Sequence, residues 1–78
     1  MRNKYRVDRV DALRVPCGMN AMRYWGKSQH DARATYAVLI PGFDVWDKPN
    51  ASYGVILSMW DDKTHDYIIL AHKGIPNV

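Results

Sequence analysis

The sequence predicts a mainly β fold, in which a small antiparallel sheet of four to five strands is built from two β-hairpins with at most one short helix. An α+β arrangement is the variant of this prediction. Composition is the first support. All eight acidic residues are Asp, which suits turns better than helix interiors because its short side chain competes for nearby backbone N–H groups. Five Tyr, three Trp and frequent Val and Ile favour strands.

Two segments that resemble each other are the second support. Residues 25–31 and 60–66 each place a Trp, four polar or small turn-forming residues and a His-Asp pair at the same spacing. Apolar residues flank both segments, which is typical of a hairpin tip. The pattern predicts two hairpins built on one plan. If the hairpins follow as a meander, both tips emerge at the same end of the sheet.

The length of 78 residues predicts a single small domain spanning residues 1–78. A domain of this size buries only ~60% of the surface of its unfolded chain. A large enclosed active site would use up most of such a core, so a surface groove or a flat binding face fits better.

The first predicted element is a strand within residues 4–15, where apolar and charged side chains loosely alternate and leave one basic face. Apolar residues three apart in the same segment make a helix the competing interpretation. Pro16 ends the segment, and Cys17-Gly18 indicates a turn.

The first hairpin is predicted from residues 19–25 and 33–40, which would be its two arms. An alternative stays open within residues 19–37. Ser28 followed by Asp31 resembles a helix N-cap with an acidic residue at the third position, and the alanines after it would suit a short helix.

Residues 41–52 predict a turn-rich connection. Phe43, Val45 and Trp46 are expected to pack it against the body, because a bare loop of this length is costly to order.

The second hairpin is predicted from residues 53–60 and 66–72, joined by a turn at 61–64. Both faces of these strands carry apolar side chains. A sheet that is apolar on both sides needs two covers. A helix, the long connection or a second subunit could supply the second cover, and this predicts a homodimer.

The charges are unevenly spread. Residues 1–33 hold eight Lys and Arg against three Asp, whereas residues 34–78 hold three Lys against five Asp. This predicts a basic face for an acidic partner, or subunits that pair front to back, with a plainly solvated surface as the alternative. Cations neutralise phosphate or carboxylate, and Trp and Tyr rings stack on bases or on Arg. The candidate binding residues are Lys4, Arg6, Arg9, Arg14, Arg23, Tyr24, Trp25, Lys27, Arg33 and Trp60.

Patterns for catalysis and metal binding are weak. The two His-Asp pairs could ligate Zn²⁺ or Mn²⁺ if the tips met, but neighbouring strand residues point to opposite faces, so each pair could offer only one side chain. Cys17 with a His could act as nucleophile and base, although nothing near it matches a catalytic signature. Gly26-Lys27-Ser28 resembles the end of a phosphate-binding loop but lacks the upstream glycine. We therefore predict no catalytic residue, no metal site and no cofactor.

These observations favour a small non-enzymatic binding protein that occupies or sequesters an acidic partner, either a protein surface or a phosphorylated small ligand. Binding of RNA or single-stranded DNA is the first alternative, although a net charge of +3 is modest for that role. A small metal- or Cys-dependent enzyme is the second. Small size and the lack of catalytic signatures are compatible with a phage-encoded accessory protein that inhibits a host system.

The expected location is the cytoplasm. A single cysteine cannot form an internal disulfide, which favours a reducing compartment. The polar start of the sequence shows no signal-peptide pattern, and no run approaches the ~20 apolar residues that cross a bilayer. We therefore expect no membrane partner.

Overall fold

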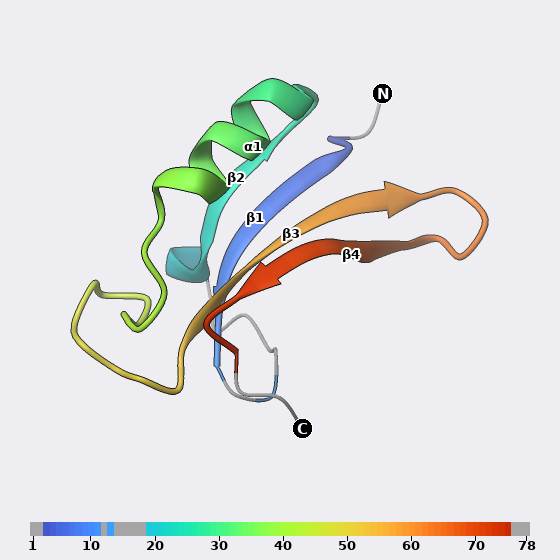
Figure 1. Cartoon of the computed structure of the whole chain (residues 1–78). Helices are drawn as coiled ribbons and strands as arrows, with labels where there is room; N and C mark the ends of the chain where they lie inside the picture. Colours follow the sequence, from blue (N-terminus) through green and yellow to red (C-terminus); the bar gives the residue numbers. More distant parts are fainter. Residues whose placement is uncertain (1–2, 12, 14–18, 76–78) are drawn as a thin grey trace.

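The computed structural model describes residues 3–11, 13 and 19–75. In that part of the chain, four strands form one antiparallel sheet, accompanied by one α-helix and a short 3-10 helix (Figure 1). The elements are β1 (Tyr5–Val10), η1 (Met19–Ala21), β2 (Met22–Gly26), α1 (Gln29–Val38), β3 (Gly54–Asp61) and β4 (Asp66–Lys73). The predicted mainly β class, with four antiparallel strands and one short helix, is confirmed.

The prediction that residues 33–40 form the second arm of the first hairpin is wrong, because α1 occupies most of that segment. The N-cap alternative is confirmed. Ser28 has extended backbone angles, and its hydroxyl accepts the N–H of Asp31 at 3.1 Å. The helix also buries Ala32 against the sheet. These local and packing terms outweigh the strand-like alternation of the sequence.

The idea of two hairpins built on one plan is therefore also wrong. Residues 25–31 leave a strand and enter a helix, whereas residues 60–66 close the β3–β4 hairpin. Only the second segment is a hairpin tip. In that tip, the Asp61 carboxylate accepts the hydroxyl of Thr64 at 3.1 Å, and His65 adopts the left-handed conformation that lets the chain turn back.

The strand order is β2-β1-β3-β4, so the predicted meander is wrong and β1 lies in the middle of the sheet. The predicted strand within 4–15 is confirmed over β1, and the competing helix is not formed there. The break at Pro16 and the turn at Cys17-Gly18 lie outside the described residues. The register places Tyr5 opposite both Gly26 and Met59, so β2 and β3 still end at the same end of the sheet.

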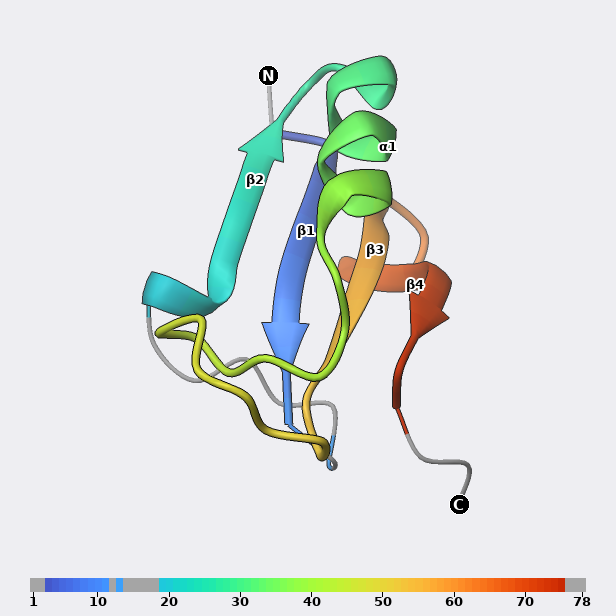
Figure 2. The same cartoon turned by 60° about the vertical axis from the view of Figure 1, so that its left-hand side comes forward.

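Helix α1 covers one face of the sheet (Figure 2). The buried side chains on that face form the main core, and partly buried aromatic and aliphatic side chains surround them. The buried members are Tyr5, Val7, Ala32, Val55 and Leu57. A smaller cluster joins Val10 and Ile56 with Ile75. The helix is thus one of the two covers that the sequence required.

The connection over residues 41–52 packs against the body through Val45, which is buried, and Phe43, which is half-buried, as predicted. The same prediction is wrong for Trp46, whose side chain is 67% exposed. The Asp44 carboxylate explains the difference. It accepts the N–H groups of Trp46 and Lys48 at 2.9 and 3.0 Å, and this local turn directs Trp46 outward.

No helix in the described part of the chain is long and apolar enough to cross a membrane.

Candidate functional site

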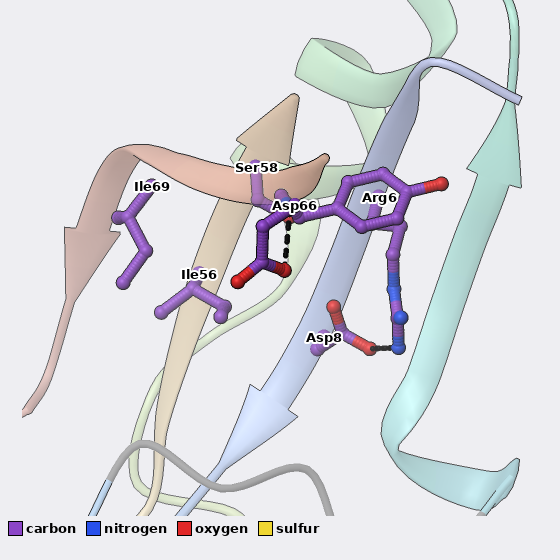
Figure 3. A pocket seen from close by; sticks show the side chains of 7 residues that line it. Arg6, Asp8, Ile56, Ser58, Asp66 and Ile69 are labelled. Carbon is purple, nitrogen blue, oxygen red and sulfur yellow. Dashed lines mark hydrogen bonds and ion pairs between the residues drawn. The ribbon is translucent and has the colours of Figure 1, made fainter. Parts of the chain in front are cut away.

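The candidate site lies on the face of the sheet opposite α1. Strand residues alternate between faces, so β1 residues next to the core residues Tyr5 and Val7 must point to the other side. Arg6 and Asp8 occupy that side, opposite Ser58 and Ile56 of β3. Together with β4 residues they surround a shallow hollow of about 280 Å³ (Figure 3). Its lining residues are Arg6, Asp8, Ile56, Ser58, Asp66, Tyr67 and Ile69.

An ion pair lies in this hollow. The Arg6 guanidinium donates to the Asp8 carboxylate at 2.9 Å, and Asp8 is only 2% exposed (Figure 3). Burial raises the pKa of the Asp8 carboxyl above its ordinary value of 3.8, because desolvation disfavours the charged form. The hydrogen bond and the charge of Arg6 oppose that effect without cancelling it. The hollow therefore contains a carboxyl group whose charged form is destabilised by burial.

This raised pKa predicts a pH dependence of stability. The folded state holds the Asp8 proton at a pH where the unfolded chain has lost it, so the contribution of Asp8 to stability falls as pH rises from 3.8 to the raised pKa. Urea denaturation from about pH 3.5 to 7 measures the unfolding free energy of wild type and of the Asp8→Asn variant. As pH rises through this window, wild type should lose stability relative to the variant. A difference that instead grows in favour of wild type would mean that the Arg6 pair outweighs desolvation.

Tyr67 of β4 contacts an aromatic residue of β2 and another of β3. Its hydroxyl accepts the Nε1–H of Trp25 at 2.8 Å and donates to the carbonyl of Asn3 at 2.6 Å. Its ring meets the Trp60 ring edge-on at a centroid separation of 5.3 Å. The Arg6 guanidinium lies 5.3 Å from the centre of the same ring. Trp25, Arg6 and Trp60 are thus assembled around one side chain.

Tyr67 was not among the residues singled out from the sequence. The available signal was the predicted second hairpin, because a turn at 61–64 places Tyr67 directly opposite Trp60. A cross-strand aromatic pair of this kind is a normal way to stabilise a sheet end.

Two exposed lysines border this assembly. Lys4 precedes β1, and its carbonyl accepts the N–H of Trp60 at 2.7 Å. Lys27 follows Gly26, which lies opposite Tyr5. Both cations are therefore at the sheet end where β2 and β3 finish. We name this surface the cationic–aromatic end. It consists of Lys4, Arg6, Trp25, Lys27, Trp60 and Tyr67.

Two other candidate cations are placed elsewhere. Arg9 is buried, and its Nη1 donates to the carbonyls of Ile40 and Phe43 at 2.9 and 3.3 Å. Arg23 donates to the carbonyl of Val45 at 2.8 Å. Both approach the Asp47 carboxylate, at 3.5 and 3.4 Å. Burial and the neighbouring Arg23 charge lower the pKa of Arg9. Both arginines hold the connection to the sheet instead of presenting their charges on the surface.

The remaining candidates are also separate from the cationic–aromatic end. Tyr24 packs against the core beneath α1, where its hydroxyl accepts the N–H of Ser28 at 3.1 Å. Arg33 is exposed on α1, which covers the other face of the sheet. Arg14 lies outside the described residues.

Features tied to the enzyme alternative are few. The described residues hold no group of three or more His, Cys, Asp or Glu side chains placed to share a metal ion. Cys17 lies outside the described part of the chain.

Comparison with known proteins gives no relative: no family model, curated protein or solved structure matches the chain.

Proposed function

We propose that this chain is a small non-enzymatic binding protein that occupies an acidic partner through its cationic–aromatic end. The observation that carries the proposal is the assembly around Tyr67, where Trp25 and Trp60 are held beside Arg6 and two exposed lysines border the group. The partner is either an acidic protein surface or a phosphorylated small ligand.

The aromatic part of this surface is fixed before any partner binds. Trp25 is 52% exposed, yet its indole N–H is hydrogen-bonded to Tyr67, so its ring keeps one orientation. A side chain that is already ordered loses little conformational entropy on binding. An exposed ring can then contact the partner at low cost.

The cationic side chains of this surface differ in how freely they can contact a partner. Lys4 and Lys27 are exposed, whereas the charge of Arg6 is partly compensated by Asp8. The hollow itself contains Asp8 and Asp66 beside one guanidinium, so an anion gains little by entering it. The lysines at the sheet end are therefore the groups that would attract an acidic partner and steer it toward Trp25.

The biological setting is part of the proposal. A shallow surface on a small chain favours occupancy of a partner over turnover, as in a phage-encoded inhibitor of a host system. The single cysteine favours the reducing cytoplasm. We also propose that the protein is a homodimer.

The test measures binding to three probes: a poly-aspartate peptide, a nucleoside triphosphate and a single-stranded oligothymidylate. Trp25→Ala should weaken binding of the preferred probe about fivefold, since an exposed ring contact of this kind contributes on the order of 1 kcal/mol. Lys4→Ala with Lys27→Ala should weaken it further and reduce its dependence on salt. Calorimetry at low and high salt provides both quantities.

The matched controls are Trp46→Ala and Lys48→Ala, which remove the same side-chain types from exposed positions in the 41–52 connection. They should leave affinity unchanged. Equal losses in the Trp25 and Trp46 variants, or affinity that ignores salt, would contradict the proposal. Preference for the oligothymidylate would favour the nucleic-acid alternative, in which the Trp25 ring stacks on bases.

A further inference from the structure

Strand β4 presents an apolar edge. It is an end strand of the described sheet and pairs with β3 on one side (Figure 1). Three consecutive large apolar residues in it, Ile68, Ile69 and Leu70, are 40%, 43% and 41% exposed. A long edge strand with such side chains offers backbone groups for pairing with another strand. The edge is therefore suited to extension of the sheet.

We propose that two copies of the chain pair antiparallel along β4 and form one continuous sheet. The proposal does not depend on the binding function, although Tyr67 belongs to both surfaces, because the binding residues lie at the end of the sheet whereas the dimer contacts run along the whole of β4. The occupant of the β4 edge is a second copy because the strand is complementary to itself in charge.

The charge complementarity follows from the order of residues in β4. An antiparallel two-fold pairing centred between Ile69 and Leu70 sets Asp66 opposite the partner's Lys73 and, by symmetry, repeats that pair once. Opposite charges facing across a strand pair stabilise it, whereas like charges destabilise it. The apolar residues then lie in the middle of the interface, with one ion pair at each end.

A β-bulge makes this pairing possible. In a regular strand, residues seven apart point to opposite faces, so Asp66 and Lys73 could not meet across a two-fold axis. The register shifts within β4, because Leu57 faces Ala71 whereas Ser58 faces Ile69, which leaves Leu70 as an extra residue. Asp66 then lies opposite Asp61 and Lys73 opposite Val55, and these two β3 positions share a face.

Both charged groups can serve the pairing. Asp66 is exposed, and its carboxylate accepts the N–H of Tyr67 at 2.8 Å and turns toward the rim of the hollow, on the face opposite α1 (Figure 3). Pairing with a Lys73 on the α1 side therefore requires Asp66 to change rotamer. Lys73 donates to the carbonyl of Tyr36 and lies 4.5 Å from the centre of that ring. An ammonium has three hydrogens, so two remain for the partner's Asp66.

The other edge of the sheet lacks this complementarity. Strand β2 has five residues and no acidic side chain, and its Arg23 is occupied by the 41–52 connection. Its exposed aromatic, Trp25, is held by Tyr67. The observations thus favour β4 over β2 as the edge that pairs with a second copy.

Charge reversal tests the register. Light scattering on a sizing column should give twice the 9.0 kDa chain mass for the wild-type protein at about 100 μM. Asp66→Lys or Lys73→Asp alone places two like-charge pairs across the interface and should raise the dimer dissociation constant about tenfold. The double variant Asp66→Lys with Lys73→Asp restores opposite charges and should return the constant to within about threefold of wild type.

A lysine in the apolar centre tests the edge itself. Ile69→Lys should give a monomer, and because this side chain is already partly exposed, the fold should survive, as circular dichroism would show. Val38→Lys, the control, adds the same charge at an exposed apolar position on α1 and should leave the dimer intact. A wild-type monomer at 100 μM, a dimer that tolerates Ile69→Lys, or a double reversal no better than the single ones would overturn the proposal.

Discussion

Replacing Arg9 by alanine is expected to lower the free energy of unfolding by about 3 kcal/mol, as is typical when one partner of a buried, hydrogen-bonded charge is removed. The guanidinium is buried and bridges the carbonyls of Ile40 and Phe43 while facing Asp47. Its loss leaves two carbonyls without their donor and exposes the anchored connection to solvent. Urea denaturation followed by tryptophan fluorescence measures the change.

Two controls separate this role from simple loss of charge. Arg33→Ala removes the same group from the exposed side of α1 and should change stability by less than about 0.5 kcal/mol. Arg9→Lys keeps the charge but cannot donate to two carbonyls from a rigid fork, so it should recover only part of the loss. If Arg9→Ala were as stable as Arg33→Ala, the bonds to the connection would not contribute to the fold.

Truncation of Leu57 to alanine is expected to have a comparable effect, about 3 kcal/mol, since buried leucines lose both transfer energy and packing. Leu57 is buried in the main core, where β3 meets β1 beneath α1. A domain of this length has a total stability of roughly 4–12 kcal/mol. The variant should therefore lose between about a quarter and three quarters of the stability of the fold and unfold at a clearly lower temperature than wild type.

The matched control is Leu13→Ala, the same change at a side chain that is 81% exposed, which should cost less than about 0.5 kcal/mol. Thermal unfolding of both variants at one fixed protein concentration measures the difference, because dimer formation makes the midpoint depend on concentration. Equal midpoints for the two variants would contradict the placement of Leu57 in the core.

The sequence predicted the fold class and the β3–β4 hairpin, since alternation and turn chemistry act locally there. It was ambiguous over residues 29–38, where a strand-like alternation and a helix N-cap at Ser28 coincided. The N-cap decided the outcome together with the burial of Ala32, which depends on contacts with strands distant in sequence. The strand order could not be predicted, because nothing local to β1 indicates that it pairs with β3.

The candidate site was predictable in part. Trp25 and Trp60 were expected at one end of the sheet and lie there, although the meander that motivated this is wrong. Arg6 and Arg9 are three apart in a strand, so the sequence alone predicts that they point to opposite faces of the sheet. The contact between Arg9 and the carbonyls that follow α1 could not be predicted from the sequence, because it depends on the path of a long connection.

The central position of β1 has a consequence for folding. Tyr5 pairs with Met59, and Val10 with Gly54, so the middle of the sheet joins segments that are far apart along the chain. Such contacts require the closure of a long loop before they stabilise anything, which slows folding. During synthesis, β1, β2 and α1 are all made before β3, so the β1–β3 ladder forms only after most of the chain is present. Pairing of β1 with β3 is therefore expected to be a slow step in folding.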